Sequence, residues 1–237
     1  MFFRRFFKLM IKRKTEGYNE LLELLKTLDD LLGAEIKNKI SIQREELNQK
    51  YKDEEIDMNN DFFQEIYAFD LNELDNSKER FKRWNNLIWC SFYLSVYVEF
   101  EDEFTRLCEA TKNMMDLNLS VNELRDKGIS RAKSYLEKVA GFDLHITQKD
   151  WDEFKIFNEI RNCLAHSGGL VRKDNTKEYI KKTDGISLNH VNKIIIEKYF
   201  VDNFISKCQE LYKNICSVLD DYAVNHLPEQ SIEKYIN

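Results

Sequence analysis

Proline occurs once in the 237 residues of this chain, at position 228, and glycine occurs only seven times. Proline breaks a helix because it lacks a backbone N–H, and glycine weakens a helix because it loses much conformational entropy on folding. Nearly the whole chain is therefore free of the residues that end helices. The sequence predicts an all-α fold, a helical bundle with long antiparallel helices.

In the first half of the chain, apolar residues recur at helical spacing in two long segments. The first covers residues 17–52, and the second begins at Asn76-Ser77, where either side chain can cap a helix, and continues to about residue 115. The polar residues 57–60 separate the two segments, and we expect a short helix near 62–69.

Start and stop signals define the helices of the second half. A capping box at 120–123 predicts a helix that continues to Gly141. A second capping signal at 147–150 predicts a helix that ends near His166, and apolar spacing predicts a last long helix over 201–222.

Between the last two helices the apolar pattern becomes short and irregular. Residues 170–173, 186–189 and 193–197 form short apolar runs, of which the last is β-branched, and polar residues separate them. These features are typical of strands and turns, so we predict a small β-hairpin appended to the bundle.

The charge balance limits the partners that the chain can bind. The first fourteen residues hold six basic side chains and no acidic one, which leaves 30 basic and 42 acidic residues in the remainder. A broad nucleic-acid-binding surface is not indicated by that balance. If RNA binds, we expect it to bind at a local basic patch.

Residues 1–14 form a basic, amphipathic N-terminal segment, and we treat residues 15–237 as a single helical domain. The segment is too short and too interrupted by charge to span a bilayer. Its phenylalanines could anchor it to a membrane surface or RNA, or could pack on the core or on a partner chain. We favour packing on protein and do not expect a membrane as a partner.

Neither a metal nor a cofactor is predicted. The five cysteines form no C-x-x-C pair that the four histidines could complete as a zinc site, so we interpret them as reduced thiols of a cytoplasmic protein. The carboxylate clusters at 53–57 and 99–103 are interpreted as solvated helix faces. No glycine-rich phosphate loop is present.

The strongest candidate site lies where the helix over 147–166 ends. Arg161, Asn162 and His166 are followed by Ser167-Gly168-Gly169. Arginine is a permanent cation that binds phosphate, and histidine is the side chain that titrates near neutral pH. This combination suits chemistry on a phosphodiester.

A helix that ends in Arg161-Asn162-x-x-x-His166 resembles the HEPN (higher eukaryotes and prokaryotes nucleotide-binding) superfamily. The motif of that family is an arginine, four to six residues and a histidine, often with a polar residue after the arginine. Residues 128–136 and 167–169 also resemble helical members of the family. The resemblance is firmest over 120–170 and extends over about 77–223.

The resemblance implies a homodimeric, metal-independent endoribonuclease of prokaryotic defence or of a toxin system. RNA would be the substrate, and an antitoxin or a regulatory protein would be a further partner. By position in the motif, Arg161 would hold the scissile phosphate, His166 would act as general acid or base, and Asn162 would orient His166 or the phosphate.

Two other interpretations stay open. The superfamily also contains non-catalytic members, so the chain could be a HEPN-like module that binds a nucleotide or a protein partner. The motif could also be structural, with Arg161 paired to Glu159, to Asp152 or to an acid elsewhere, and with His166 placed favourably at a helix C-terminus.

Helix geometry connects the motif to dimer formation. Arg161 and His166 are five residues apart, so on an ideal helix they point about 140° away from each other. Asn162 and His166 share a face. Either the last helical turn is distorted, or the long arginine curls round, or a second chain supplies the complementary group. We therefore expect the end of this helix to lie at or beside a two-fold interface.

Overall fold

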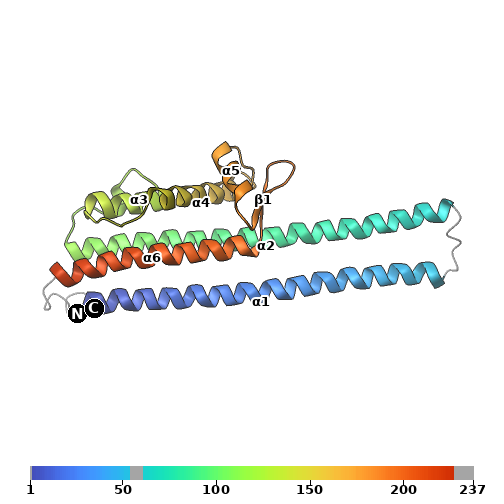
Figure 1. Cartoon of the computed structure of the whole chain (residues 1–237), viewed down its shortest axis with the longest axis horizontal. Coiled ribbons are helices and arrows are strands. Elements are labelled where there is room, and N and C mark those ends of the chain that lie inside the picture. Colours follow the sequence, from blue (N-terminus) through green and yellow to red (C-terminus); the bar gives the residue numbers. More distant parts are fainter. Residues whose placement is uncertain (1, 54–60, 227–237) are drawn as a thin grey trace.

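The computed structural model describes residues 2–53 and 61–226, apart from the side chains of residues 2–15 and of several others in the first two helices. Two long helices, α1 (Phe2–Asp53) and α2 (Asp61–Met115), lie antiparallel and form the length of the molecule (Figure 1). Near the tip of this pair, the Tyr51 hydroxyl donates to the Asp70 carboxylate over 3.0 Å.

Helix α2 runs without a break through the point where a new helix was expected. The separate short helix over 62–69 and the start at Asn76-Ser77 are therefore wrong predictions. The Ser77 hydroxyl donates to the carbonyl of Glu73 over 3.1 Å, four residues back in the same helix. Because residues 61–115 contain neither proline nor glycine, a serine with that internal bond does not end the helix.

Helix α1 passes through residue 14 without interruption. The side chains of residues 2–15 lie outside the described part of the structure. The packing predicted for the N-terminal phenylalanines therefore stays a prediction. No helix among the described residues has both the length and the apolar character that crossing a bilayer requires.

The capping box at 120–123 forms, but it opens a much shorter helix than expected. The Ser120 amide donates to the Glu123 carboxylate over 2.6 Å, around the single 3-10 turn η1 (Val121–Glu123). The chain then becomes extended at Leu124, and α3 begins only at Gly128, where φ is +58°. Helix α3 (Gly128–Ser134) continues into a π-helical turn, η2 (Tyr135–Val139), beyond which Gly141 has a φ of +77°.

The predicted helix at the motif and the predicted hairpin are both confirmed. Helix α4 (Gln148–His166) is followed by α5 (Asp174–Lys182), which was not predicted because its nine residues carry few apolar positions. Strands β1 (Ile186–Leu188) and β2 (Ile194–Ile196) pair antiparallel, with Ile186 opposite Ile196. Helix α6 (Lys198–His226) completes the described chain.

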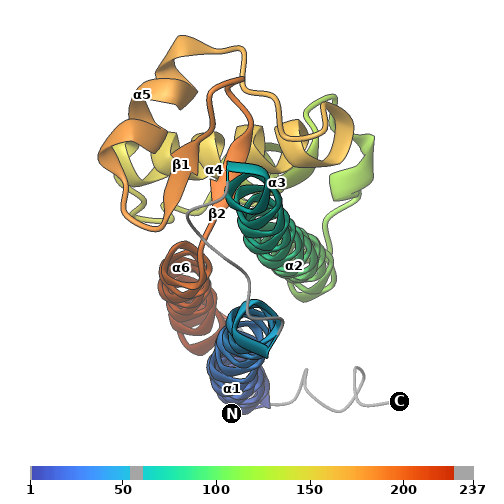
Figure 2. The ribbon, with the colours of Figure 1, turned by 90° about the vertical axis from the view of Figure 1, so that its right-hand side faces the viewer.

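The core lies between α2, α4 and α6, and α1 packs along α6 and α2 on the far side from α4 (Figure 2). Aromatic rings from three helices meet there. The Phe204 ring centroid lies 4.8 Å from that of Tyr93 and 5.0 Å from that of Phe157. The hairpin is fixed to this body by Asn86, whose side-chain oxygen accepts from the Ile196 amide over 2.8 Å.

Candidate functional site

The motif lies on a helix that is firmly held by the core. The buried face of α4 consists of residues spaced three or four apart, namely Trp151, Phe154, Phe157, Ile160 and Cys163. Thr147 caps the helix start by accepting from the Asp150 amide over 3.1 Å. The buried Tyr93 hydroxyl on α2 donates to the Phe157 carbonyl over 2.8 Å. The end of α4 is therefore presented on a rigid support.

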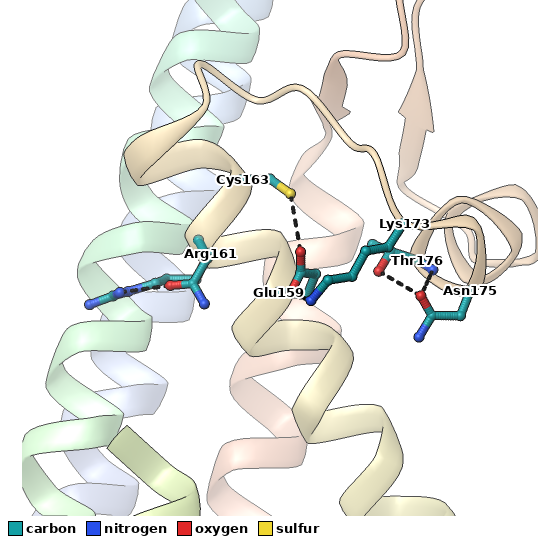
Figure 3. A network of polar contacts seen from close by, with 7 residues as sticks. Glu159, Arg161, Cys163, Lys173, Asn175 and Thr176 are labelled. Atoms are coloured by element: carbon teal, nitrogen blue, oxygen red, sulfur yellow. Dashed lines mark hydrogen bonds and ion pairs between the residues drawn. The ribbon is translucent and has the colours of Figure 1, made fainter. Parts of the chain in front are cut away.

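Arg161 lies on the side of α4 that faces α2 (Figure 3). Its Nη1 donates to the side-chain oxygen of Asn162 over 2.9 Å, and its Nη2 lies 3.9 Å from Oε2 of Glu101. The guanidinium carbon also lies 5.8 Å from the ring centroid of Tyr97. The side chain is half-buried, with 27% of its surface exposed. The structure thus brings Arg161 and Asn162 together and adds two partners of Arg161 from α2.

Glu101 belongs to the carboxylate cluster at 99–103, which we expected to be a solvated face. That expectation is wrong for Glu103, which is 1% exposed and accepts from Arg106 over 3.0 Å. Glu101 is half-buried between Arg161 and Gly128, and a Cβ placed on Gly128 would lie 3.1 Å from its Oε1. No local sequence pattern identifies this role, because it depends on how α2 and α4 pack.

Tyr97 lies one helical turn before Glu101 and is completely buried. Its hydroxyl has no hydrogen-bond partner among the described residues. Burial raises the pKa of this phenol far above its usual range, Glu101 raises the pKa further, and Arg161 opposes both effects. Tyr97 is therefore a neutral, buried aromatic wall beside the guanidinium.

His166 is the last residue of α4 and is exposed to solvent. Its side chain makes no hydrogen bond or ion pair with any residue that the structure describes. The structure therefore does not join His166 to Arg161 by a direct contact. An exposed imidazole can exchange a proton with a bound molecule.

The turn after His166 is tightly constrained. The amides of Ser167 and Gly169 both donate to the Cys163 carbonyl, over 3.0 and 2.9 Å. Gly168 and Gly169 have φ angles of +56° and +82°, which glycine adopts without strain. Beyond them, the Gly169 carbonyl accepts from the Ile194 amide over 3.0 Å. This contact fixes the turn against the hairpin.

Two other acids on α4, Glu159 and Asp152, do not pair with Arg161. Glu159 instead binds Lys173 over 2.5 Å, with the thiol of Cys163 nearby (Figure 3). Asp152 binds Lys155 over 2.8 Å. Of the structural partners considered for Arg161, these two are wrong, and the acid elsewhere in the chain is Glu101.

The described residues provide neither a metal site nor an activated thiol. No group of three His, Cys, Asp or Glu side chains within them could hold a metal ion. All five cysteines are buried and free. Burial and the neighbouring Glu159 raise the pKa of the Cys163 thiol, so it is not a thiolate nucleophile at neutral pH. Most of the carboxylate cluster at 53–57 lies outside the described residues.

Comparison of this chain with protein-family models, with curated proteins and with solved structures gives no match. The function is therefore inferred from the motif and from the geometry around it.

Proposed function

We propose that this protein is a metal-independent endoribonuclease of the HEPN type, acting in the cytoplasm in prokaryotic defence or in a toxin system. The observation that carries the proposal is the pairing of Arg161 with Asn162 close to an exposed, uncommitted His166 at the end of the same helix. A fixed cation and a free proton carrier are groups that metal-free RNA cleavage needs from a protein.

The contacts of Arg161 leave it able to bind a phosphate. A guanidinium has five N–H donors, and Asn162 uses one of them. Glu101, at 3.9 Å, is too far for a direct hydrogen bond and holds the cation mainly by charge. The remaining donors can take the oxygens of a scissile phosphate in the bidentate geometry that arginine favours.

RNA brings its own nucleophile to this site. The 2′-oxygen attacks the adjacent phosphorus while the bond from phosphorus to the 5′-oxygen breaks. The 2′-hydroxyl proton must go to a base and the leaving 5′-oxygen must receive a proton, and His166 can serve one of these two transfers. Arg161 offsets the charge that develops on the phosphate.

A two-fold dimer would supply the second proton carrier. Arg161 contacts α2 of its own chain, whereas His166 is exposed beyond that contact. Symmetry would bring two Arg161–His166 sets together with one set of contacts used twice. Each cleavage site could then use one imidazole as base and the other as acid.

Cleavage of labelled RNA in EDTA by wild type, Arg161→Ala and His166→Ala tests the proposal. We expect both substitutions to abolish cleavage and to leave the cooperative unfolding transition in place. A mixed dimer of the two inactive variants retains one Arg161 and one His166, so if the sites are shared it should recover a small part of the activity, with one of the two proton transfers left to water. Equal activity in all three proteins, or a wild-type activity that EDTA removes, would contradict the metal-free mechanism.

The internal contacts of Arg161 favour one alternative, a non-catalytic HEPN-like module that binds a nucleotide or a protein. The cation lies over a buried ring and beside a carboxylate, so it could serve packing alone. In that case Arg161→Ala would lower the free energy of unfolding, and wild-type protein would not cleave RNA.

A further inference from the structure

Two segments around the motif are free of acidic residues. Residues 160–173 and 185–196 contain no aspartate or glutamate, although the chain holds 42 acids in 237 residues. A stretch of that combined length would hold about five acids at the average frequency of this chain. The same segments contain Arg161, His166, Arg172 and Lys193.

The structure places these two segments side by side. Leu170 and Lys193 form an antiparallel bridge, and the Val171 amide donates to the Asn192 carbonyl over 3.0 Å. Residues directly opposite in an antiparallel pair point to the same face, so Lys193 shares a face with Leu170. Arg172 directly follows Val171, so its backbone lies next to the point where the two segments are joined.

Both cations are available to a ligand. Arg172 and Lys193 are exposed and form no ion pair with any described residue, whereas the neighbouring Lys173 is neutralised by Glu159. The backbone beneath Lys193 is rigid, because the side-chain oxygen of Asn189 accepts from the amides of Val191 and Lys193 over 3.0 and 2.9 Å. A ligand would therefore meet two positive charges that no described acid neutralises.

We infer that Arg172 and Lys193 bind the phosphate backbone of single-stranded RNA as the strand passes the exposed end of α4 at His166. This inference rests on the proposed ribonuclease function and names the surface that holds its substrate. A polyanion is repelled by a chain with a net charge of −6, so it gains most where acids are absent. Contacts of this kind are independent of base sequence.

Equilibrium binding of a fluorescent 2′-O-methyl oligoribonucleotide tests the inference. That probe has no 2′-hydroxyl proton and cannot be cleaved by the proposed route. The slope of log K against log salt concentration is negative, and for the double variant Arg172→Gln/Lys193→Gln we expect its magnitude to decrease by about 1.4, or roughly 0.7 for each phosphate that the protein no longer neutralises. Affinity at low salt should fall about tenfold or more.

The double variant Lys149→Gln/Lys213→Gln is the matched control. Both lysines are exposed, and neither pairs with another described residue. Lys149 lies in the first turn of α4, seventeen residues before His166 and therefore roughly 26 Å from it. The control removes the same charge, so its salt dependence should stay within a few tenths of the wild-type slope.

The outcomes separate this inference from the proposed function. An unchanged slope in Arg172→Gln/Lys193→Gln, an equal decrease in the control, or a wild-type protein that does not bind the probe would overturn the inference. His166→Ala should bind the probe with the wild-type slope while failing to cleave ordinary RNA. If wild type binds the probe through Arg172 and Lys193 but does not cleave RNA, the inferred RNA-binding surface is supported and the ribonuclease proposal fails.

Discussion

Tyr93 and Tyr97 allow a buried hydroxyl with a hydrogen-bond partner to be compared with a buried hydroxyl without one in the described part of the chain. They lie one turn apart on α2, both are 0% exposed, and both rings pack on Phe204. The Tyr93 hydroxyl donates to the Phe157 carbonyl, whereas the Tyr97 hydroxyl has no hydrogen-bond partner among the described residues. Replacing each tyrosine by phenylalanine removes a hydrogen-bonded hydroxyl at position 93 and an unpaired hydroxyl at position 97.

The two substitutions should change stability in opposite directions. Tyr93→Phe removes a satisfied buried hydrogen bond, which costs about 1 kcal/mol. Tyr97→Phe removes a polar group that was desolvated without compensation, so the free energy of unfolding should rise by about 1 kcal/mol or more. The difference between the variants is then roughly 2 kcal/mol, equivalent to about 4–8 °C in Tm for a chain of this size.

Urea titration followed by circular dichroism measures this difference, with equal m-values as the condition for comparing midpoints. Each variant serves as the control for the other. If Tyr97→Phe destabilises the protein as much as Tyr93→Phe does, the Tyr97 hydroxyl has a partner in solution and the reasoning is refuted.

Two further predictions concern glycine contacts and alkaline pH. A Cβ on Gly185, where φ is +76°, would lie 2.5 Å from the Phe200 amide nitrogen, so Gly185→Ala should lower the unfolding free energy by about 2 kcal/mol or more in urea titrations. Gly33→Ala, with nothing within 4 Å of the new atom in α1, should be neutral or stabilise the protein by up to about 1 kcal/mol. If Gly33→Ala lowered the unfolding free energy more than Gly185→Ala, both estimates would be contradicted. Burial raises the pKa of Cys90 to about 11 and of Cys108 and Cys216 to about 12, so these thiols stay neutral in the folded protein after they ionise in the unfolded chain. Stability in reducing buffer should therefore decline as pH rises above about 8.5, by up to about 1.4 kcal/mol per pH unit for each thiol, and a flat profile to about pH 10 would count against their burial.

The helices that the sequence predicts well are those with apolar periodicity and clear ends. Helix α4 is an example, since Thr147 caps its start and Gly168 follows its end. Ser77 shows where a local signal fails. A serine can cap a helix or bond back to a carbonyl four residues before it, and the surrounding chain decides which. Ser120 does cap, but only a single 3-10 turn follows it, because the chain becomes extended at Leu124.

The candidate site is also only partly predictable from the sequence. The motif is contiguous in sequence, so Arg161, Asn162 and His166 could be identified without a structure. Tyr97 and Glu101 lie about sixty residues earlier, and only the packing of α2 against α4 brings them to the guanidinium. Likewise, the two segments without acids that carry Arg172 and Lys193 lie side by side only because the bridge between Leu170 and Lys193 joins them.

The length of the α1–α2 pair affects how the mass of this protein can be measured. A helix of 52 residues is about 78 Å long, and a thin rod of that length has a radius of gyration of about 23 Å. A compact domain of 237 residues has a radius of gyration of about 18 Å. The 28.4 kDa monomer will therefore elute early in gel filtration and resemble a larger particle. Light scattering or sedimentation equilibrium reports mass independently of shape, so these methods can separate an elongated monomer from a dimer.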